Sequence, residues 1–223
     1  MPQRQLVIVD PAVHTAEVDC FNRIALRSSI PATYHLPGLV GMDSLRGTGA
    51  PPAGIIVLGS STSVHDDRPW QRPLETWLMT QMAAGTPTLG LCFGHQLIAH
   101  LFGGEVGFLF PDKKKLLGFR PVSLEADRLW GNSPKQGELF ASHREAVVKC
   151  PKEMRVIARS NDVTIDGLAH QTLPVWAFQT HPEATPLFVA SQGAPLPPSD
   201  STYRFGHSLV DAFVDFAAKA ARP

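Results

Sequence analysis

The sequence of 223 residues has little cysteine, no excess of either charge and no long hydrophobic run. Its three cysteines, Cys20, Cys92 and Cys150, are odd in number and far apart, which argues against a disulfide framework or a zinc site. Basic and acidic residues number 20 each, so the chain lacks the basic footprint of a nucleic-acid or membrane-surface protein. The first apolar segment, Leu6–Val9, is too short for a secretory signal or a membrane span. We therefore expect a cytoplasmic protein with no nucleic-acid or membrane partner.

The apolar content, 43%, is sufficient for one full core, and the length fits one α/β domain over residues 1–223. Buried strands are predicted at Leu6–Val9, 55–58 and Thr88–Leu91, and they alternate with amphipathic helices. Beyond Gly104 the pattern changes to short β-rich segments between turn residues, the last of them at Val175–Phe178. The sequence thus predicts an open, mainly parallel sheet flanked by helices, with an added antiparallel strand layer.

Two segments rich in glycine or proline, 38–54 and 184–200, are predicted to be loops. The first is either a plain connection or a variable rim around a site. The second is predicted to be an extended loop, and the pattern after it predicts a final amphipathic helix.

Cys92 lies where a predicted strand turns sharply into a helix, in the segment Gly90-Leu-Cys-Phe-Gly94. Glycines two positions before and after a nucleophile allow a strained backbone and keep side chains away from an approaching substrate. The first amides of the helix, from Phe93 onward, would favour a thiolate and could bind an oxyanion. Taken alone, a free cysteine is more often a buried packing residue, so the choice depends on the rest of the chain.

Three segments together carry a resemblance to a known family. Gly90-Leu-Cys-Phe-Gly-His-Gln96 closely resembles the nucleophile motif of class I glutamine amidotransferases, and two further matches, at 54–64 and at 176–183, follow the order of that family. The matches span most of the chain. The resemblance implies a flavodoxin-like open sheet and a Cys-His-Glu triad.

The resemblance identifies Cys92 as the nucleophile, His181 as the base and Glu183 as the residue that orients the imidazole. A thiol has a pKa of roughly 8.5, so it needs such a base or an electropositive site to act at neutral pH. In the implied reaction, the thiolate attacks the side-chain amide of glutamine, and His181 protonates the departing ammonia and then activates water against a glutamyl thioester.

The oxyanion hole is expected to use the amides of Phe93 and Gly59. Only the first glycine of the corresponding family turn is kept in Gly59-Ser60-Ser61, and the sequence leaves open whether the amide of Gly59 or that of Ser60 points inward. Gln96 matches a family position that helps to hold the substrate amino acid. Ser142 and His143 resemble the family's Ser-His segment over the substrate, although a plain polar strand end fits them equally well.

No metal or organic cofactor is implied, and three interpretations remain. The chain is a glutaminase subunit, resembling that of GMP synthase, which feeds ammonia to a separately encoded synthase. Alternatively it hydrolyses γ-glutamyl bonds in peptides or amines with the same triad, or it is a catalytically idle binding or regulatory module. The intact residues Cys92, His181 and Glu183 weigh against the last of these.

Overall fold

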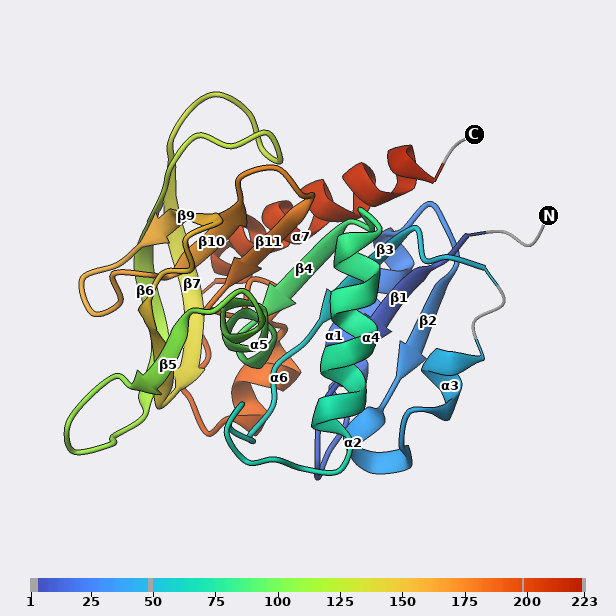
Figure 1. Cartoon of the computed structure of the whole chain (residues 1–223). Coiled ribbons are helices and arrows are strands. Elements are labelled where there is room, and N and C mark those ends of the chain that lie inside the picture. The colour runs from blue at the N-terminus through green and yellow to red at the C-terminus, as the bar shows by residue number, and fades with distance from the viewer. Residues whose placement is uncertain (1–3, 48–49, 198, 222–223) are drawn as a thin grey trace.

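The computed structural model describes residues 4–47, 50–197 and 199–221 and is built on a nine-stranded sheet in the order β2-β1-β3-β4-β11-β10-β9-β6-β7 (Figure 1). The first five strands are parallel, and the remaining four continue the same sheet in antiparallel pairing. The parallel strands are β1 (Leu6–Val9), β2 (Ala32–His35), β3 (Gly54–Val57), β4 (Thr88–Leu91) and β11 (Val175–Phe178). The antiparallel strands are β6 (Leu116–Leu124), β7 (Lys135–His143), β9 (Met154–Arg159) and β10 (Gly167–His170), while β5 (Glu105–Phe108) and β8 (Glu145–Lys149) pair separately.

Helices cover both faces of the parallel half of the sheet. In Figure 1, α4 (Gln71–Ala83) and α5 (Phe93–Leu101) lie on one face, and α1 (Val18–Arg27) and α7 (Ser201–Ala220) lie on the other. Three short helices complete the fold: α2 (Pro37–Val40), α3 (Asp43–Arg46) and α6 (Pro186–Ser191). None of the helices in the described ranges is long and apolar enough to cross a membrane.

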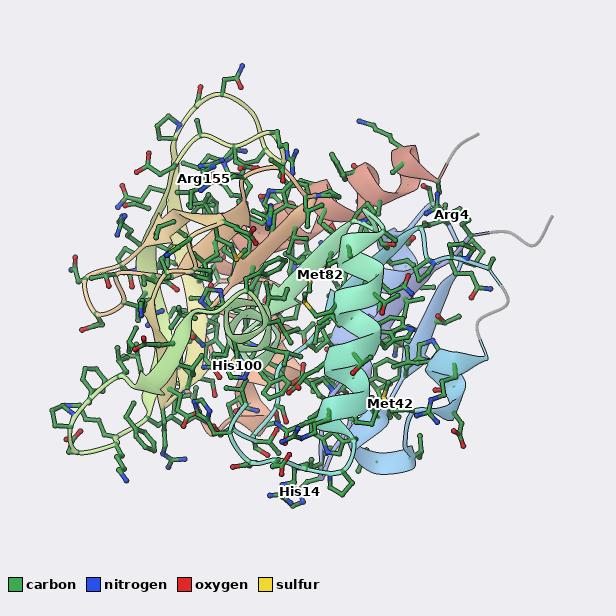
Figure 2. All side chains as sticks on the ribbon, viewed as in Figure 1. Arg4, His14, Met42, Met82, His100 and Arg155 are labelled. Atoms are coloured by element: carbon green, nitrogen blue, oxygen red, sulfur yellow. The ribbon has the colours of Figure 1, made fainter. Side chains whose placement is uncertain are left out.

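The continuous apolar strands are explained by a core on each face of the sheet. Successive side chains of a strand point to opposite faces, so Leu6 and Ile8 pack with Phe213 of α7, whereas Val7 and Val9 belong to the core that contains Met82 of α4. In Figure 2, Met82 lies where α4 faces the sheet. Both faces of β1 are therefore buried, as a run without polar alternation requires.

The predicted fold class, an open α/β sheet with helices on both faces and added antiparallel strands, is confirmed. The predicted strands at Thr88–Leu91 and Val175–Phe178 have the observed bounds. Several details differ from the prediction; β3, for example, spans Gly54–Val57 rather than 55–58. The segment 38–54 contains most of α2 and all of α3, with residues 48–49 outside the described part; the segment 184–200 contains α6; and β10 was not predicted.

The parallel strands bring several chain segments to one edge of the sheet. Because β1, β3, β4 and β11 run in the same direction, the residues that follow them meet at their carboxyl ends, where ligands bind in open α/β sheets. Figure 1 shows β4 pointing toward α5, and Figure 2 shows His14, from the segment after β1, at the corresponding end of the molecule. Cys92 and His181 both lie at this edge.

Candidate active site

Cys92 occupies a strained turn between β4 and α5. Its φ of 52° and ψ of −100° lie outside the conformations that residues with a side chain usually adopt. A Cβ atom on Gly94 would lie 2.3 Å from the carbonyl oxygen of Val57, and one on Gly90 would lie 2.4 Å from that of Gly94. The turn can form because Gly90 and Gly94 have no side chain, so the start of α5 can pack closely against β3 and β4. This packing holds the thiol at the edge of the sheet.

His181 and Glu183 lie beyond the end of β11, beside the cysteine. The backbone amide of Cys92 donates to the carbonyl of Phe178 over 2.8 Å, which continues the β4–β11 pairing up to the turn. The amide of His181 donates to the carbonyl of Phe140 over 2.7 Å. The Nδ1 atom of His181 lies 2.8 Å from Oε1 of Glu183, and both side chains are buried. This bond fixes the orientation of the imidazole ring.

The electrostatics of the site favour a charged imidazole. Burial alone would lower the pKa of His181, but the charges of Cys92 and Glu183 and hydrogen bonds to both oppose this effect. Together they raise the pKa of His181 well above its ordinary value. A positively charged imidazole therefore lies beside the thiol in this arrangement, and a thiolate is the form of cysteine that reacts as a nucleophile.

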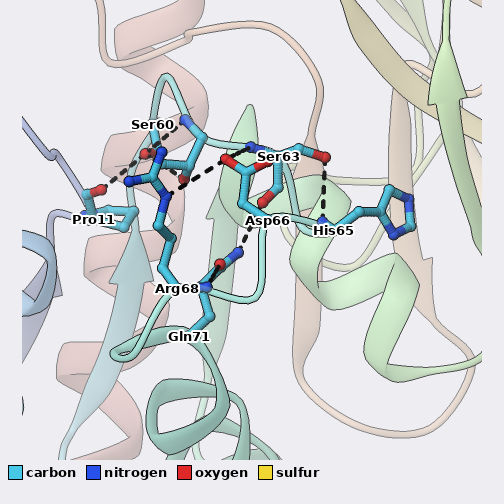
Figure 3. Close-up of polar contacts among 8 residues, drawn as sticks. Pro11, Ser60, Ser63, His65, Asp66, Arg68 and Gln71 are labelled. Carbon is cyan, nitrogen blue, oxygen red and sulfur yellow. Dashed lines mark hydrogen bonds and ion pairs between the residues drawn. The ribbon is translucent and has the colours of Figure 1, made fainter.

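Gly59 lies against the same two side chains. A Cβ atom on Gly59 would be 2.9 Å from Cε1 of His181 and 3.7 Å from Cβ of Cys92, so the ring requires a glycine here. Ser60 does not carry its side chain toward the thiol: its Oγ donates to the carbonyl of Pro11 over 2.8 Å and contacts Oγ1 of Thr62 over 2.9 Å (Figure 3). The hydrogen bond from Ser60 thus connects the Gly59-Ser60 turn to the segment after β1.

The three predicted substrate-contact residues line the same cleft but already have partners. Gln96 donates through Nε2 to the carbonyl of Glu145 over 2.7 Å and to Oε1 of Gln179 over 3.2 Å. Ser142 donates through Oγ to Oε1 of Gln192 over 2.7 Å. Nδ1 of His143 lies 2.9 Å from the carbonyl of Glu145, and burial together with the charge of Arg120 lowers the pKa of His143 to about 3.

Two residues at the site were not identified from the sequence. Gln179 donates through Nε2 to Sγ of Cys92 over 3.8 Å. Glu17 lines the cleft, and its buried carboxylate oxygen Oε2 has no hydrogen-bond partner among the described residues. Gln179 lies within the segment 176–183 that carries the resemblance, which was a usable signal. No sequence pattern marks Glu17, which directly precedes α1.

The cleft has a volume of about 770 Å³. Cys92, Gly59, Gln96 and His181 lie on its wall, together with residues from the segment after β1 and from α6. A volume in this range is typical of sites for small molecules. Among the described residues, no group of three or more His, Cys, Asp or Glu side chains is placed to hold a metal ion.

A strained thiol in an open α/β sheet, with a histidine and a carboxylate beside it, has the geometry that nucleophilic catalysis by cysteine requires. The comparisons give the family. The family model described as "Glutamine amidotransferase class-I" matches residues 42–187. The chain belongs to the class I glutamine amidotransferase family.

Relatives within this family carry one recurring name, that of a glutamine-hydrolysing GMP synthase subunit. The chain is 33% identical over 154 residues to this subunit from Pyrococcus abyssi, and the alignment covers 69% of this chain and 74% of the relative. It is 38% identical to the corresponding subunit from Methanocaldococcus jannaschii over 100 residues, which are 45% of this chain and 52% of the relative. The second alignment therefore spans only about half of that relative.

Solved structures agree with the fold. A glutamine amidotransferase of Thermotoga maritima has a TM-score of 0.75 with 12% identity and covers 98% of this chain and 100% of that one. A protein of Thermoplasma acidophilum, named as a GMP synthase subunit on a provisional basis, has a TM-score of 0.72 with 18% identity, over 98% and 96% of the two chains. At these identities the likeness supports the fold alone.

Proposed function

We propose that this protein hydrolyses the side-chain amide of glutamine through Cys92, His181 and Glu183 and releases ammonia for a separate acceptor. The observation that carries the proposal is the placement of a strained thiol beside a buried imidazole whose Nδ1 lies 2.8 Å from a carboxylate. Relatives named as glutamine-hydrolysing subunits add support. The separate acceptor would be a synthase encoded elsewhere.

In the proposed reaction, the Cys92 thiolate attacks the amide carbon of glutamine and forms a carbon–sulfur bond. The amides of Gly59 and Phe93 stabilise the oxyanion of the tetrahedral intermediate. When the carbon–nitrogen bond breaks, the imidazolium of His181 supplies the proton with which the nitrogen leaves as ammonia. His181 then takes a proton from water, the hydroxide attacks the thioester, and glutamate leaves as the thiolate reforms.

Gln96, Ser142 and His143 are proposed to contact the amino-acid part of the substrate. All three line the cleft beside Cys92. Because the side-chain nitrogen of Gln96 and the ring of His143 are already engaged with the protein, we expect the backbone of Ser142 and His143 and the oxygen of Gln96 to provide the contacts.

Hydrolysis of γ-glutamyl peptides or amines is a second candidate, and the cleft supports it. A volume of about 770 Å³ leaves room beyond a glutamine side chain for a larger leaving group. The chemistry would be the same, with an amine in place of ammonia.

The deciding experiment measures glutamate release from glutamine and from a panel of γ-glutamyl peptides, with the wild type, Cys92→Ala and the control Cys150→Ala. Release from glutamine that is lost only in Cys92→Ala is expected. Release from the peptides alone would favour the second candidate. Activity that persists in Cys92→Ala would overturn both.

A further inference from the structure

Glu17 has an unusual position beside the triad. Its Oε1 atom lies 3.5 Å from the place that a Cβ on Gly59 would occupy, and Cε1 of His181 lies 2.9 Å from the same place. The carboxyl group and the imidazole therefore lie against the same side of Gly59. The other oxygen, Oε2, is buried and has no hydrogen-bond partner within the described part of the chain. A buried polar atom without a partner is costly and needs a physical explanation.

A network of hydrogen bonds holds the backbone at Glu17 in place. Asp10, directly after β1, accepts from the amide of Ala12 over 2.9 Å and from the amide of Glu17 over 2.7 Å. The hydroxyl of Tyr34 also donates to Asp10. On the other side, Ser60 ties the carbonyl of Pro11 to the Gly59 turn (Figure 3). The segment after β1 is thus held at both ends, with Glu17 against the site.

The surroundings of Glu17 disfavour its charged form. Burial raises the pKa of Glu17 well above its ordinary value, and the negative charges of Glu183, Asp10 and Cys92 act in the same direction. His181 is the neighbour that acts in the opposite direction. The titratable groups that interact with Glu17 are Asp10, Cys20, Tyr34, Cys92, His181 and Glu183.

We propose that Glu17 is a positioning residue that acts through His181 as an uncharged carboxylic acid. This proposal rests on the proposed hydrolytic function. While Glu17 keeps its proton, Glu183 is the carboxylate that stabilises the imidazolium, and His181 can release its proton to the leaving nitrogen. When Glu17 ionises as the pH rises, a second negative charge near the ring holds that proton more tightly. Turnover then falls because the proton transfer to the leaving group is weakened.

The first test compares the wild type with Glu17→Gln and Glu17→Ala. Glutamine has the shape of an uncharged glutamic acid and cannot ionise. We expect Glu17→Gln to lose the part of the decline in kcat with rising pH that the ionisation of Glu17 causes in the wild type. Glu17→Ala should lower kcat about tenfold with little change in KM, because His181 would be less well placed and would lose part of its contribution as the acid–base group. A decline of kcat with rising pH that is the same in Glu17→Gln as in the wild type, or a wild-type kcat in Glu17→Ala, would overturn the proposal.

The second test needs no substrate and so separates this proposal from the hydrolytic one. The imidazole of His181 is titrated by NMR in the wild type, Glu17→Gln and the control Glu153→Gln, which alters an exposed carboxylate near His170. In the wild type, the charge that Glu17 acquires as the pH rises should raise the pKa of His181, so this pKa should be lower in Glu17→Gln only. If no variant hydrolyses glutamine but this shift appears, the proposed substrate fails and the role of Glu17 stands. The same pKa of His181 in all three proteins would refute that role.

Discussion

The side-chain amide of Gln179 donates to Sγ of Cys92 over 3.8 Å, from the strand end that also carries His181. The same amide group accepts through Oε1 from Gln96 over 3.2 Å. One glutamine therefore connects the thiol to a residue of α5 that lines the cleft. A donor beside a thiol stabilises the thiolate relative to the protonated form.

We predict that Gln179→Met slows alkylation of Cys92 by iodoacetamide at neutral pH. A hydrogen bond to a charged group contributes about 1.5 kcal/mol, which corresponds to roughly a tenfold slower reaction when the thiolate loses it. Gln171→Met is the matched control because the side chain of Gln171 is exposed and donates to the carbonyl of Lys152. The alkylation rate of each cysteine is followed by mass spectrometry. Equal rates at Cys92 in all proteins would show that this contact does not activate the thiol.

Glu183→Gln should reduce kcat by about a hundredfold or more, because the imidazole loses the carboxylate that fixes its tautomer and stabilises its charge. The pKa of His181 should fall at the same time, since the charge of Glu183 is among the causes that raise it. Steady-state kinetics and an NMR titration measure the two effects. Glu138→Gln, an exposed residue of β7, should change neither. A variant Glu183→Gln with wild-type kcat would remove Glu183 from the mechanism.

Gly94→Ala should destabilise the fold as well as the site. The added methyl group would lie 2.3 Å from the carbonyl oxygen of Val57, and neither backbone can move without disturbing β3 or α5. We expect a loss of about 2 kcal/mol or more in the free energy of unfolding, measured with urea. At Gly107 the same substitution meets only side-chain atoms of Val148 at 3.8 Å and should be tolerated. Similar losses at the two positions would contradict the packing argument.

Two buried histidines should make the protein sensitive to acid. Burial lowers the pKa of His95 to about 3, and burial with the charge of Arg120 lowers that of His143 to about 3. In the unfolded chain a histidine titrates near ~6.5, so below this pH the unfolded state binds more protons than the folded state. Stability is therefore fully present above about pH 6.5 and falls as the pH decreases toward 3, by about 1.4 kcal/mol per pH unit for each histidine.

His95→Gln should make this pH dependence shallower, whatever its effect on stability at neutral pH, because one titrating group is removed. Urea unfolding at neutral and mildly acid pH measures the slope. The exposed His14→Gln should leave it unchanged. Parallel slopes for His95→Gln and the wild type would mean that other groups dominate the acid response.

The buried ion pair between Arg120 and Asp166 predicts that removing one partner costs much more stability than replacing both. Nη2 of Arg120 lies 3.0 Å from both carboxylate oxygens. Arg120→Met leaves the carboxylate without its partner and should cost about 3 kcal/mol or more, whereas adding Asp166→Asn should recover part of the loss. Lys149→Met, which breaks an exposed pair with Glu105, should cost less than about 1 kcal/mol. Urea unfolding compares the four proteins, and a small effect of Arg120→Met would show that Asp166 is already neutral.

The sequence predicted the strand and turn around Cys92 well because the local pattern is strong there. A short buried segment with two leucines, a glycine two positions before and after the cysteine and a helical repeat all agree with the observed geometry. Strand β10 was missed because Asp166-Gly167 resembles a turn, whereas the strand of four residues begins at Gly167. A short strand of this kind is specified by its two neighbours rather than by its own composition.

The positions of Glu17 and Gln179 could not be predicted from local pattern. Glu17 lies beside the triad because Asp10 and Ser60 hold the segment after β1, and the bond from Ser60 joins residues 49 positions apart. Gln179 reaches Cys92 through the β4–β11 register. Such relationships depend on how separate segments assemble, so they are visible only in three dimensions.

Strand β11 is the last strand in the described part of the chain, and it lies in the middle of the sheet between β4 and β10. During synthesis, the turn that carries Cys92 therefore leaves the ribosome long before strand β11 has been made. Until residues 175–183 have emerged and inserted, the two halves of the sheet have no common strand, and the thiol has neither the imidazole nor the amide donor beside it. Since closure of such distant pairings is slow, a nascent or truncated chain should hold an inert cysteine, and reactivity should mark completed folding.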